Sequence, residues 1–191
     1  MHATREALLG AALAVFTEHT YAGTAVPMVA ERAGVAVGTI YRHFPSKQAL
    51  GNAVYQRWKG RLLERLTEPS GGTERVDPDE SARAAFGRMW SVMHAFAAEH
   101  PAAFAFLEYQ QHAGYLDDQS RQIIERSTAF AVAVVSRGQQ RGEIRAGDPV
   151  VLVALAYGAF IGLSKAAWSG APVGPKDFQD AEIAVWDLLR R

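Results

Sequence analysis

The 191-residue chain contains no cysteine. This absence excludes a catalytic thiol, a zinc site built on thiolates and a disulfide framework, and it is compatible with a reducing compartment. An excess of one charge is also missing, because 20 Lys and Arg balance 20 Asp and Glu. The net charge of the whole chain therefore indicates no polyanionic partner.

Long hydrophobic runs are scarce. The longest apolar stretch, Val150 to Leu163, is interrupted only by Gly158 and Gly162 and falls short of the roughly 20 residues that span a bilayer. We therefore expect a buried helix there and no membrane partner. The first residues, Met1 to Glu6, lack a charged segment followed by an unbroken apolar stretch, so we expect a cytoplasmic protein without a signal peptide.

Motifs typical of enzymes are absent. The sequence has no Gly-rich phosphate loop, no His-Glu-x-x-His and no Gly-x-Ser-x-Gly, and we expect no catalytic residue and no cofactor. Glu108 and His112, four residues apart, could bind a metal together with His94 or His100. A hydrogen-bonded histidine beside a carboxylate is the favoured interpretation, and no metal is expected. An enzyme and a helical adaptor that binds only proteins are kept as alternative classes.

Helical periodicity runs through the whole chain, and strand-like alternation is missing, so the fold class is all-α. Thr24, Ser46 and Asp117 are candidate N-caps, and Gly34 stands where a helix should end. The spacing predicts helices over about 4–19, 24–33, 37–43, 46–67, 86–97, 101–113, 117–141, 149–168 and 177–189.

Charge and composition change near residue 67. Residues 1–66 contain eight Lys or Arg and four Asp or Glu, whereas residues 67–191 contain twelve and sixteen. The segment Glu68 to Asp79, rich in Pro, Gly and polar residues, is the best linker candidate. We predict a basic domain over 1–66 that can face a polyanion, and a separate domain over 67–191.

A helix-turn-helix is predicted over residues 26–44. Two short helices flank Gly34, which supplies the positive φ of the turn, and Val35 fills the corner between them. Ile40 and Phe44, four residues apart, anchor the second helix to the core. In this motif the second helix enters the DNA major groove.

These residues carry a family resemblance. The ordered segments are Ala30 to Val35, Gly38 to Phe44 and Ser46 to Leu50, and the preceding helix matches as well. Over about residues 5–60 the chain resembles the TetR family of bacterial transcriptional regulators. The resemblance implies a homodimer whose N-terminal heads bind a palindromic operator in double-stranded DNA, and whose C-terminal helices form the interface and a pocket for a small-molecule effector. The same head serves repressors and activators, and a repressor is the favoured interpretation.

The resemblance also implies roles for residues of the head. The family contacts phosphates at the positions of Tyr41, His43 and Lys47. Arg42 can donate two hydrogen bonds to guanine, at O6 and N7. The residues implied to contact DNA are Thr24, Ala36, Val37, Gly38, Thr39, Tyr41, Arg42, His43 and Lys47.

Large side chains on the central helices of the second domain could line an apolar, ligand-binding cavity, although each alone could equally fill a core. We expect a hydrophobic or aromatic ligand. The candidate ligand-binding residues are Trp90, Met93, Phe104, Leu107, Glu108, His112, Tyr115, Phe130, Tyr157 and Trp168.

Small residues recur at four-residue spacing along the apolar helix near residue 158. They allow another helix to approach closely, and with the last helix they would form a four-helix interface in the dimer. Burial within the chain is the alternative. The candidate interface residues are Ala154, Gly158, Gly162, Ala181, Val185 and Leu188.

Overall fold

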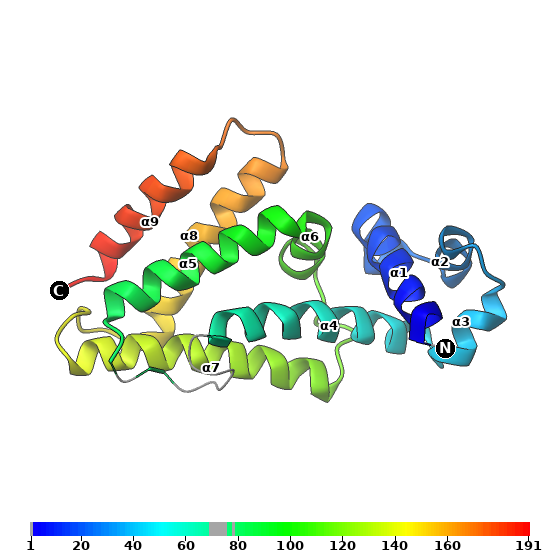
Figure 1. Cartoon of the computed structure of the whole chain (residues 1–191), viewed down its shortest axis with the longest axis horizontal. Coiled ribbons are helices and arrows are strands. Elements are labelled where there is room, and N and C mark those ends of the chain that lie inside the picture. The colour runs from blue at the N-terminus through cyan, green and yellow to red at the C-terminus, as the bar shows by residue number, and fades with distance from the viewer. Residues whose placement is uncertain (1, 69–75, 78) are drawn as a thin grey trace. The chain divides into compact units, whose positions relative to one another are not determined.

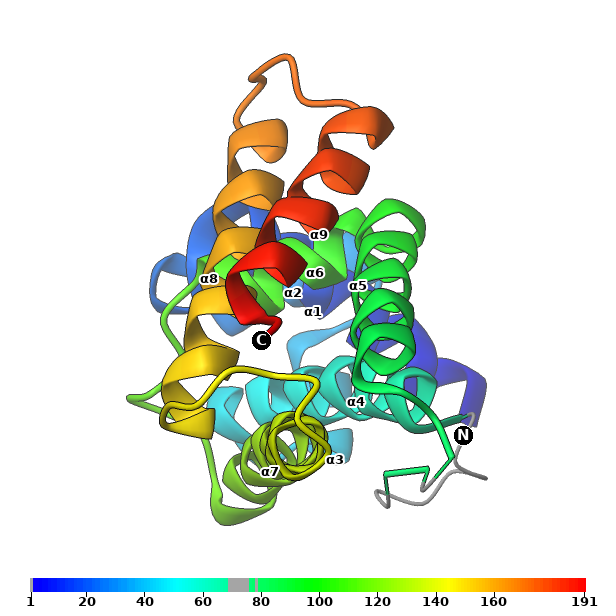
Figure 2. The same ribbon diagram turned by 90° about the vertical axis from the view of Figure 1, so that its left-hand side faces the viewer.

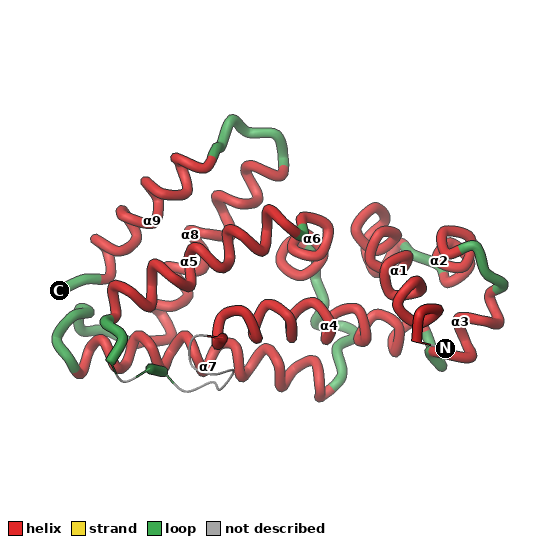
Figure 3. The backbone as a smooth tube through the Cα atoms, viewed as in Figure 1, coloured by secondary structure: helices red, strands yellow, loops and turns green. Residues whose placement is uncertain are grey.

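The computed structural model describes residues 2–68, 76–77 and 79–191. Over these residues the chain forms helices joined by loops (Figure 3). The one β-bridge among them is an isolated pair between Ile144 and Arg190. The fold class predicted from the sequence, all-α, is confirmed. The helices are α1 (His2–Gly23), α2 (Val26–Ala33), α3 (Val37–His43), α4 (Lys47–Thr67), α5 (Ala82–Glu99), α6 (Pro101–Tyr109), α7 (Asp118–Gln140), α8 (Pro149–Trp168) and α9 (Pro175–Leu189) (Figure 1).

The helices form two compact units. The first comprises residues 1–62 and 99–124, and the second comprises residues 63–98 and 125–191. Helices α4 and α7 are continuous and contribute residues to both. Most of the predicted linker, Glu68 to Asp79, lies outside the described residues.

Several helix ends follow the predicted chemistry. The Ser46 hydroxyl oxygen accepts from the Ala49 N–H at 3.0 Å, and an Asp117 carboxylate oxygen accepts from the Ser120 N–H at 2.8 Å. Gly34 ends α2 with φ of 66°.

The predicted cap at Thr24 is wrong. Ala25 takes the N-cap position of α2, and the buried Thr24 hydroxyl donates instead to the Thr20 carbonyl oxygen at 2.7 Å. The preceding helix is interrupted at Thr20, which adopts φ of 61°. Because the Thr24 hydroxyl is engaged at this break, it does not cap α2.

The first unit is built on three helices of the head. Helix α1 packs against α2 and α6, and α2 packs against α3. Leu8, Phe16, Val29 and Ile40 are nearly inaccessible to solvent and form its apolar centre. This packing fixes α3 on the head while leaving its opposite face exposed.

The second unit contains α5, α8, α9 and most of α7. Trp90, Phe160 and Phe178 meet in its core: the rings of Trp90 and Phe160 lie 5.0 Å apart, and the Trp90 indole N–H donates to the Phe178 carbonyl at 2.9 Å. Figure 2 shows α8 and α9 side by side, joined by the loop over 169–174.

Helix α8 is not the buried helix that we expected. Leu152, Phe160 and Ser164 are its buried residues, and only 17% of its most apolar 18-residue window is buried. By length and composition α8 could also cross a membrane, but one such helix is weak evidence of a membrane span. Composition alone could not show that most of this apolar helix faces outward in a single protomer.

Candidate DNA-binding surface and ligand cavity

The turn before α3 sets the direction of that helix. Gly34 lies in the left-handed region, and the Val35 N–H donates to the Ala30 carbonyl at 3.0 Å, which closes the end of α2. Ile40 and Phe44 are 1% and 3% exposed. The predicted anchors of the second helix are therefore confirmed, and the other face of α3 remains open.

That open face carries most of the predicted DNA-contacting residues. Tyr41 is 50% exposed, Gly38, Arg42 and the N-cap Ala36 are exposed, and the remaining three residues of the set on α3 are half-buried: Val37, Thr39 and His43. Among the described residues the Arg42 side chain has no hydrogen-bond or ion-pair partner.

Another exposed arginine of the head is already engaged. The Arg32 guanidinium donates to both carboxylate oxygens of Glu18, at 2.9 and 2.6 Å. This hydrogen-bonded pair raises the pKa of Arg32 and lowers the pKa of Glu18. The guanidinium donors of Arg42 are therefore available for an external acceptor. Two donors of the Arg32 guanidinium are already hydrogen-bonded to Glu18.

The two remaining predicted contacts, Thr24 and Lys47, lie outside α3. The Thr24 hydroxyl points inward to the Thr20 carbonyl, so its geometry does not favour the phosphate contact that we expected. Lys47, in the first turn of α4, is half-buried, and its ammonium lies 4.5 Å from the centre of the Tyr21 ring. Burial lowers the pKa of Lys47.

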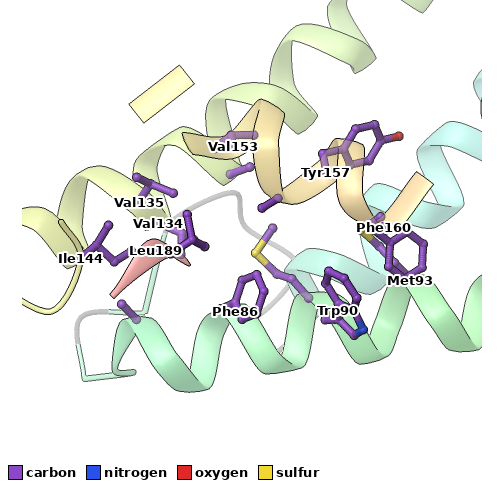
Figure 4. Close-up of a pocket in the computed structure, with 14 residues that line it drawn as sticks. Phe86, Trp90, Met93, Val134, Val135, Ile144, Val153, Tyr157, Phe160 and Leu189 are labelled. Atoms are coloured by element: carbon purple, nitrogen blue, oxygen red, sulfur yellow. The ribbon is translucent and has the colours of Figure 1, made fainter. Parts of the chain in front are cut away.

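An apolar cavity of about 90 Å³ lies in the second unit (Figure 4). Helices α5, α7 and α8 supply most of its walls, and Ile144 and Leu189 lie at one end. Among the residues that the structure describes, no charged side chain lines it. Its lining residues are Ala82, Phe86, Met89, Trp90, Met93, Ala131, Val134, Val135, Ile144, Val153, Ala156, Tyr157, Phe160 and Leu189.

Three of the predicted ligand-binding residues line this cavity: Trp90, Met93 and Tyr157. Phe130 is buried on α7 but is not part of the lining, and Trp168 is 52% exposed. The other five belong to the first unit and do not line the cavity: Phe104, Leu107, Glu108, His112 and Tyr115.

Phe86 and Met89 line the cavity but were missing from the predicted set. Their spacing with Trp90 and Met93 already marked one face of a helix, and that signal could have found them. Ile144 and Leu189 come from a loop and from the end of α9, and no local spacing connects them with that helix.

Glu108 and His112 are engaged with neighbouring residues. Glu108 accepts a hydrogen bond from the Lys59 ammonium at 2.8 Å, and both side chains are largely buried. His112 Nε2 lies 2.6 Å from the Phe106 carbonyl oxygen, which requires an N–H there, so Nδ1 accepts from the Tyr115 hydroxyl at 2.6 Å. Burial lowers the pKa of His112. Within the described residues, no group of three or more His, Cys, Asp or Glu could hold a metal.

The predicted interface residues differ in exposure. Ala154, Gly158 and Gly162 are exposed on α8 and Leu188 is exposed on α9, whereas Ala181 is half-buried and Val185 is buried. Four large side chains add to the exposed apolar surface of these two helices: Val151, Leu155, Tyr157 and Ile183.

A helix-turn-helix whose second helix is exposed, followed by a second helical unit with an apolar cavity, is the architecture expected of a DNA-binding transcriptional regulator. Comparison with protein families gives the same result. Residues 8–54 match the family described as bacterial regulatory proteins of the tetR family, and residues 67–191 match the tetracyclin repressor-like C-terminal domain. The chain belongs to the TetR family of transcriptional regulators, which is non-enzymatic.

Curated relatives include the fatty acid metabolism regulator protein of Bacillus subtilis. It is 27% identical over 146 residues, which are 76% of this chain and 73% of the relative. The transcriptional repressor KstR of Rhodococcus jostii is 42% identical over 67 residues, 35% of this chain and about a third of KstR (32%).

Solved structures share the fold along nearly the whole chain. A TetR family regulator from Marinobacter aquaeolei has a TM-score of 0.81 at 18% identity, covering 98% of this chain and 95% of that one. FadR from Bacillus subtilis, solved in complex with stearoyl-CoA, has a TM-score of 0.76 at 20% identity, covering 96% of each chain. At these identities the likeness concerns the fold alone.

Proposed function

We propose that this chain is a homodimeric cytoplasmic repressor whose two heads bind an inverted-repeat operator, and that a ligand with a long apolar chain releases it. The proposal rests on two observations within the described part of the chain: Arg42 on α3 is exposed and has no ionic or hydrogen-bond partner there, and no charged residue lines the cavity of the second unit.

Within the head, Arg42 reads a base and its neighbours hold the DNA backbone. A bidentate arginine–guanine contact discriminates by about 1–3 kcal/mol against a wrong base. Tyr41, His43 and Lys47 contact phosphates, which position the head without reading sequence. Gly38 lets the backbone of α3 approach the groove closely, and Ala36, Val37 and Thr39 offer apolar contact to thymine methyl groups.

The ligand is an acyl chain carried by a thioester such as an acyl-CoA. A lining without a charged side chain gives no ionic partner to a buried charge, so the cavity favours an uncharged hydrocarbon segment. The names of similar proteins support this class, since the chain is similar to a fatty acid metabolism regulator of Bacillus subtilis, and FadR of the same species was solved with stearoyl-CoA. A lipid-responsive regulator would use the same combination of apolar cavity and DNA-binding head.

Ligand entry would require the walls of the cavity to move. About 90 Å³ is less than the roughly 300–1,000 Å³ of common ligand sites. Helix α7 lines the cavity through Ala131, Val134 and Val135, and its N-terminal cap is hydrogen-bonded to α4 through Gln56. A ligand that favours a wider cavity would therefore shift the population away from the DNA-binding arrangement.

The dimer uses the exposed apolar face of α8 and α9. Val151, Leu155, Ile183 and Leu188 are each about half exposed, and a second copy of this surface would remove them from water. Nothing lies within 4 Å of a Cβ built at Gly158 or Gly162, so a partner helix has room to approach.

Native mass spectrometry of the purified protein with added stearoyl-CoA tests the proposal. We expect a dimer that gains the mass of the ligand, whereas CoA without the acyl chain adds nothing. The variant Ala156→Phe, which fills the cavity from α8, should remain dimeric and lose the ligand. A monomer would overturn the paired-head arrangement, and equal retention of CoA and stearoyl-CoA would overturn the acyl-chain site.

A further inference from the structure

Tyr21 is held between two groups of different chemistry. On one side its ring stacks on Tyr115, with centroids 3.6 Å apart and planes 16° from parallel. The Lys47 ammonium lies 4.5 Å from the ring centre, within the range of a cation–π contact. One ring thus joins the connection between α6 and α7 to the first turn of α4.

The stack depends on an unusually close approach to α4. A Cβ built at Gly51 would lie 2.7 Å from Tyr21 Cε2 and 3.0 Å from Tyr115 Cε2. Any larger residue at this position would push both rings outward. The absence of a side chain at Gly51 therefore fixes where the two rings sit.

Both the side chain and the backbone of Tyr115 are hydrogen-bonded. Its hydroxyl donates to His112, which is hydrogen-bonded to the Phe106 carbonyl in α6. Its backbone carbonyl accepts from the amides of Gln48 and Asn52, both at 2.9 Å. The ring that supports Tyr21 therefore belongs to a rigid, buried part of the first unit.

A second contact holds Tyr21 through its backbone. The Gln110 side-chain oxygen accepts from the Tyr21 N–H at 3.3 Å, and the Gln110 amide donates to the Phe16 carbonyl at 2.7 Å. These two backbone groups lie on either side of Thr20, whose φ and ψ are not helical. The connection between α6 and α7 thus places both the backbone and the ring of Tyr21.

The Lys47 ammonium has few donors left for other partners. An ammonium carries three N–H groups, and one of them points to the Ala22 carbonyl at 3.4 Å. The Tyr21 ring occupies another side of the cation. The remaining donor is directed by these two contacts, so the position of the Tyr21 ring decides what Lys47 can reach.

We propose that Tyr21 is a positioning residue for DNA binding: clamped between Tyr115 and Lys47, it directs the Lys47 ammonium toward a DNA phosphate and makes that contact depend on the α6–α7 connection. This inference rests on the proposed function, in which Lys47 contacts the DNA backbone. Movement of Tyr115 would withdraw the support of Tyr21 and weaken the Lys47 contact without any change in α3.

A double-mutant cycle on the full-length protein tests the proposal. The probe is the duplex that wild-type protein selects from a random pool, and the readout is its dissociation constant between 50 and 300 mM salt. Lys47→Ala removes one phosphate contact from each head of the dimer and should lower the steepness of the salt dependence by about 1.8. Tyr21→Leu should lower affinity and steepness by a similar amount, and Tyr21→Phe, which keeps the ring, should restore both.

The decisive comparison is the double variant. If Tyr21 acts through Lys47, Tyr21→Leu should weaken binding by less than about twofold in the Lys47→Ala background. In an Arg42→Ala background, Tyr21→Leu should weaken binding by the same factor as in the wild-type protein, so that the two losses of affinity multiply. Gly51→Ala displaces the ring without removing it and should reproduce the effect of Tyr21→Leu if that variant fails to fold.

Two results would overturn the inference, and they differ in meaning. If the losses from Tyr21→Leu and Lys47→Ala multiply, Tyr21 does not act through Lys47, and the DNA contact of Lys47 stands. If Lys47→Ala changes neither affinity nor salt dependence, the contact assigned to Lys47 in the proposed function is itself wrong.

Discussion

Replacing Asn52 with leucine should destabilise the folded protein strongly. The Asn52 side-chain oxygen accepts from the Asp117 N–H at 2.9 Å and from the Ser120 hydroxyl at 2.7 Å, and its amide donates to the carbonyls of Gln48 and Tyr115. Asn52 is 3% exposed, so water cannot replace these bonds. Leucine has a similar size but satisfies none of them.

The magnitude follows from the two donors that lose their acceptor. A buried donor left unsatisfied costs about 1–3 kcal/mol, and leucine recovers part of this through apolar burial. We expect a net loss of about 2–4 kcal/mol in the free energy of unfolding. For a chain of this length, about 2–4 °C of melting temperature corresponds to each kcal/mol, so the midpoint should fall by about 5–15 °C.

Urea unfolding followed by circular dichroism measures this loss directly. Gln48→Leu is the matched control, because it removes one donor to the Tyr115 carbonyl, which keeps its bond from Asn52. We expect the control to lose less than about 1 kcal/mol. If Asn52→Leu unfolds within about 0.5 kcal/mol of wild type, the network does not hold the α6–α7 connection to α4 as described.

Three further predictions concern the dimer interface at Gly158, the two glycines of α4 and the buried His112. Gly158→Ala should weaken the dimer in sedimentation equilibrium because its methyl group meets the partner helix, whereas Gly10→Ala, with equally open surroundings on α1, should leave the dimer unchanged. Gly60→Ala should raise the free energy of unfolding by about 0.5–1 kcal/mol, and Gly51→Ala in the same helix should lower it, since its methyl group would clash with two rings. The pKa of His112 is lowered in the folded chain, so the unfolded chain takes the proton first as the pH falls below about 6.5. Stability should therefore drop between pH 7 and 5.5 in wild type, and His112→Gln should reduce that drop in denaturant titrations at each pH.

Local chemistry made much of the fold predictable. Ser46 and Asp117 cap helices in the structure as the sequence predicts, and Gly34 adopts the left-handed conformation that its place in the motif requires. These features depend on residues within four positions of one another. The helical spacing of Ile40 and Phe44 likewise predicted which face of α3 is buried.

Features that depend on distant residues were not predictable in the same way. The Thr24 hydroxyl bonds to the carbonyl of Thr20, where the helix is interrupted, instead of capping α2. Gln110, about 90 positions later, hydrogen-bonds the backbone on either side of Thr20. The first N–H of α5, at Ala82, donates to the Glu143 carboxylate at 2.6 Å, across 61 positions. No spacing in the sequence indicates either contact.

The ligand cavity was predictable only along single helices. Size and apolarity identified Trp90, Met93 and Tyr157, but they also selected Phe104 and Leu107, which fill the core of the first unit. A large apolar side chain looks the same in the sequence whether it borders a cavity or a packed core. Three-dimensional packing alone separates the two environments.

Selection of DNA from a pool of random duplexes tests the central claim most directly. Wild-type protein should enrich an inverted repeat whose half-sites lie about one helical turn apart, as expected for paired heads. Arg42→Ala should lose the preference for one base pair in each half-site, while Arg32→Gln should recover the wild-type sequence. Two results would contradict the assignment of α3 as the element that reads DNA. In one, wild-type protein enriches no sequence; in the other, Arg42→Ala enriches the same sequence as wild-type protein.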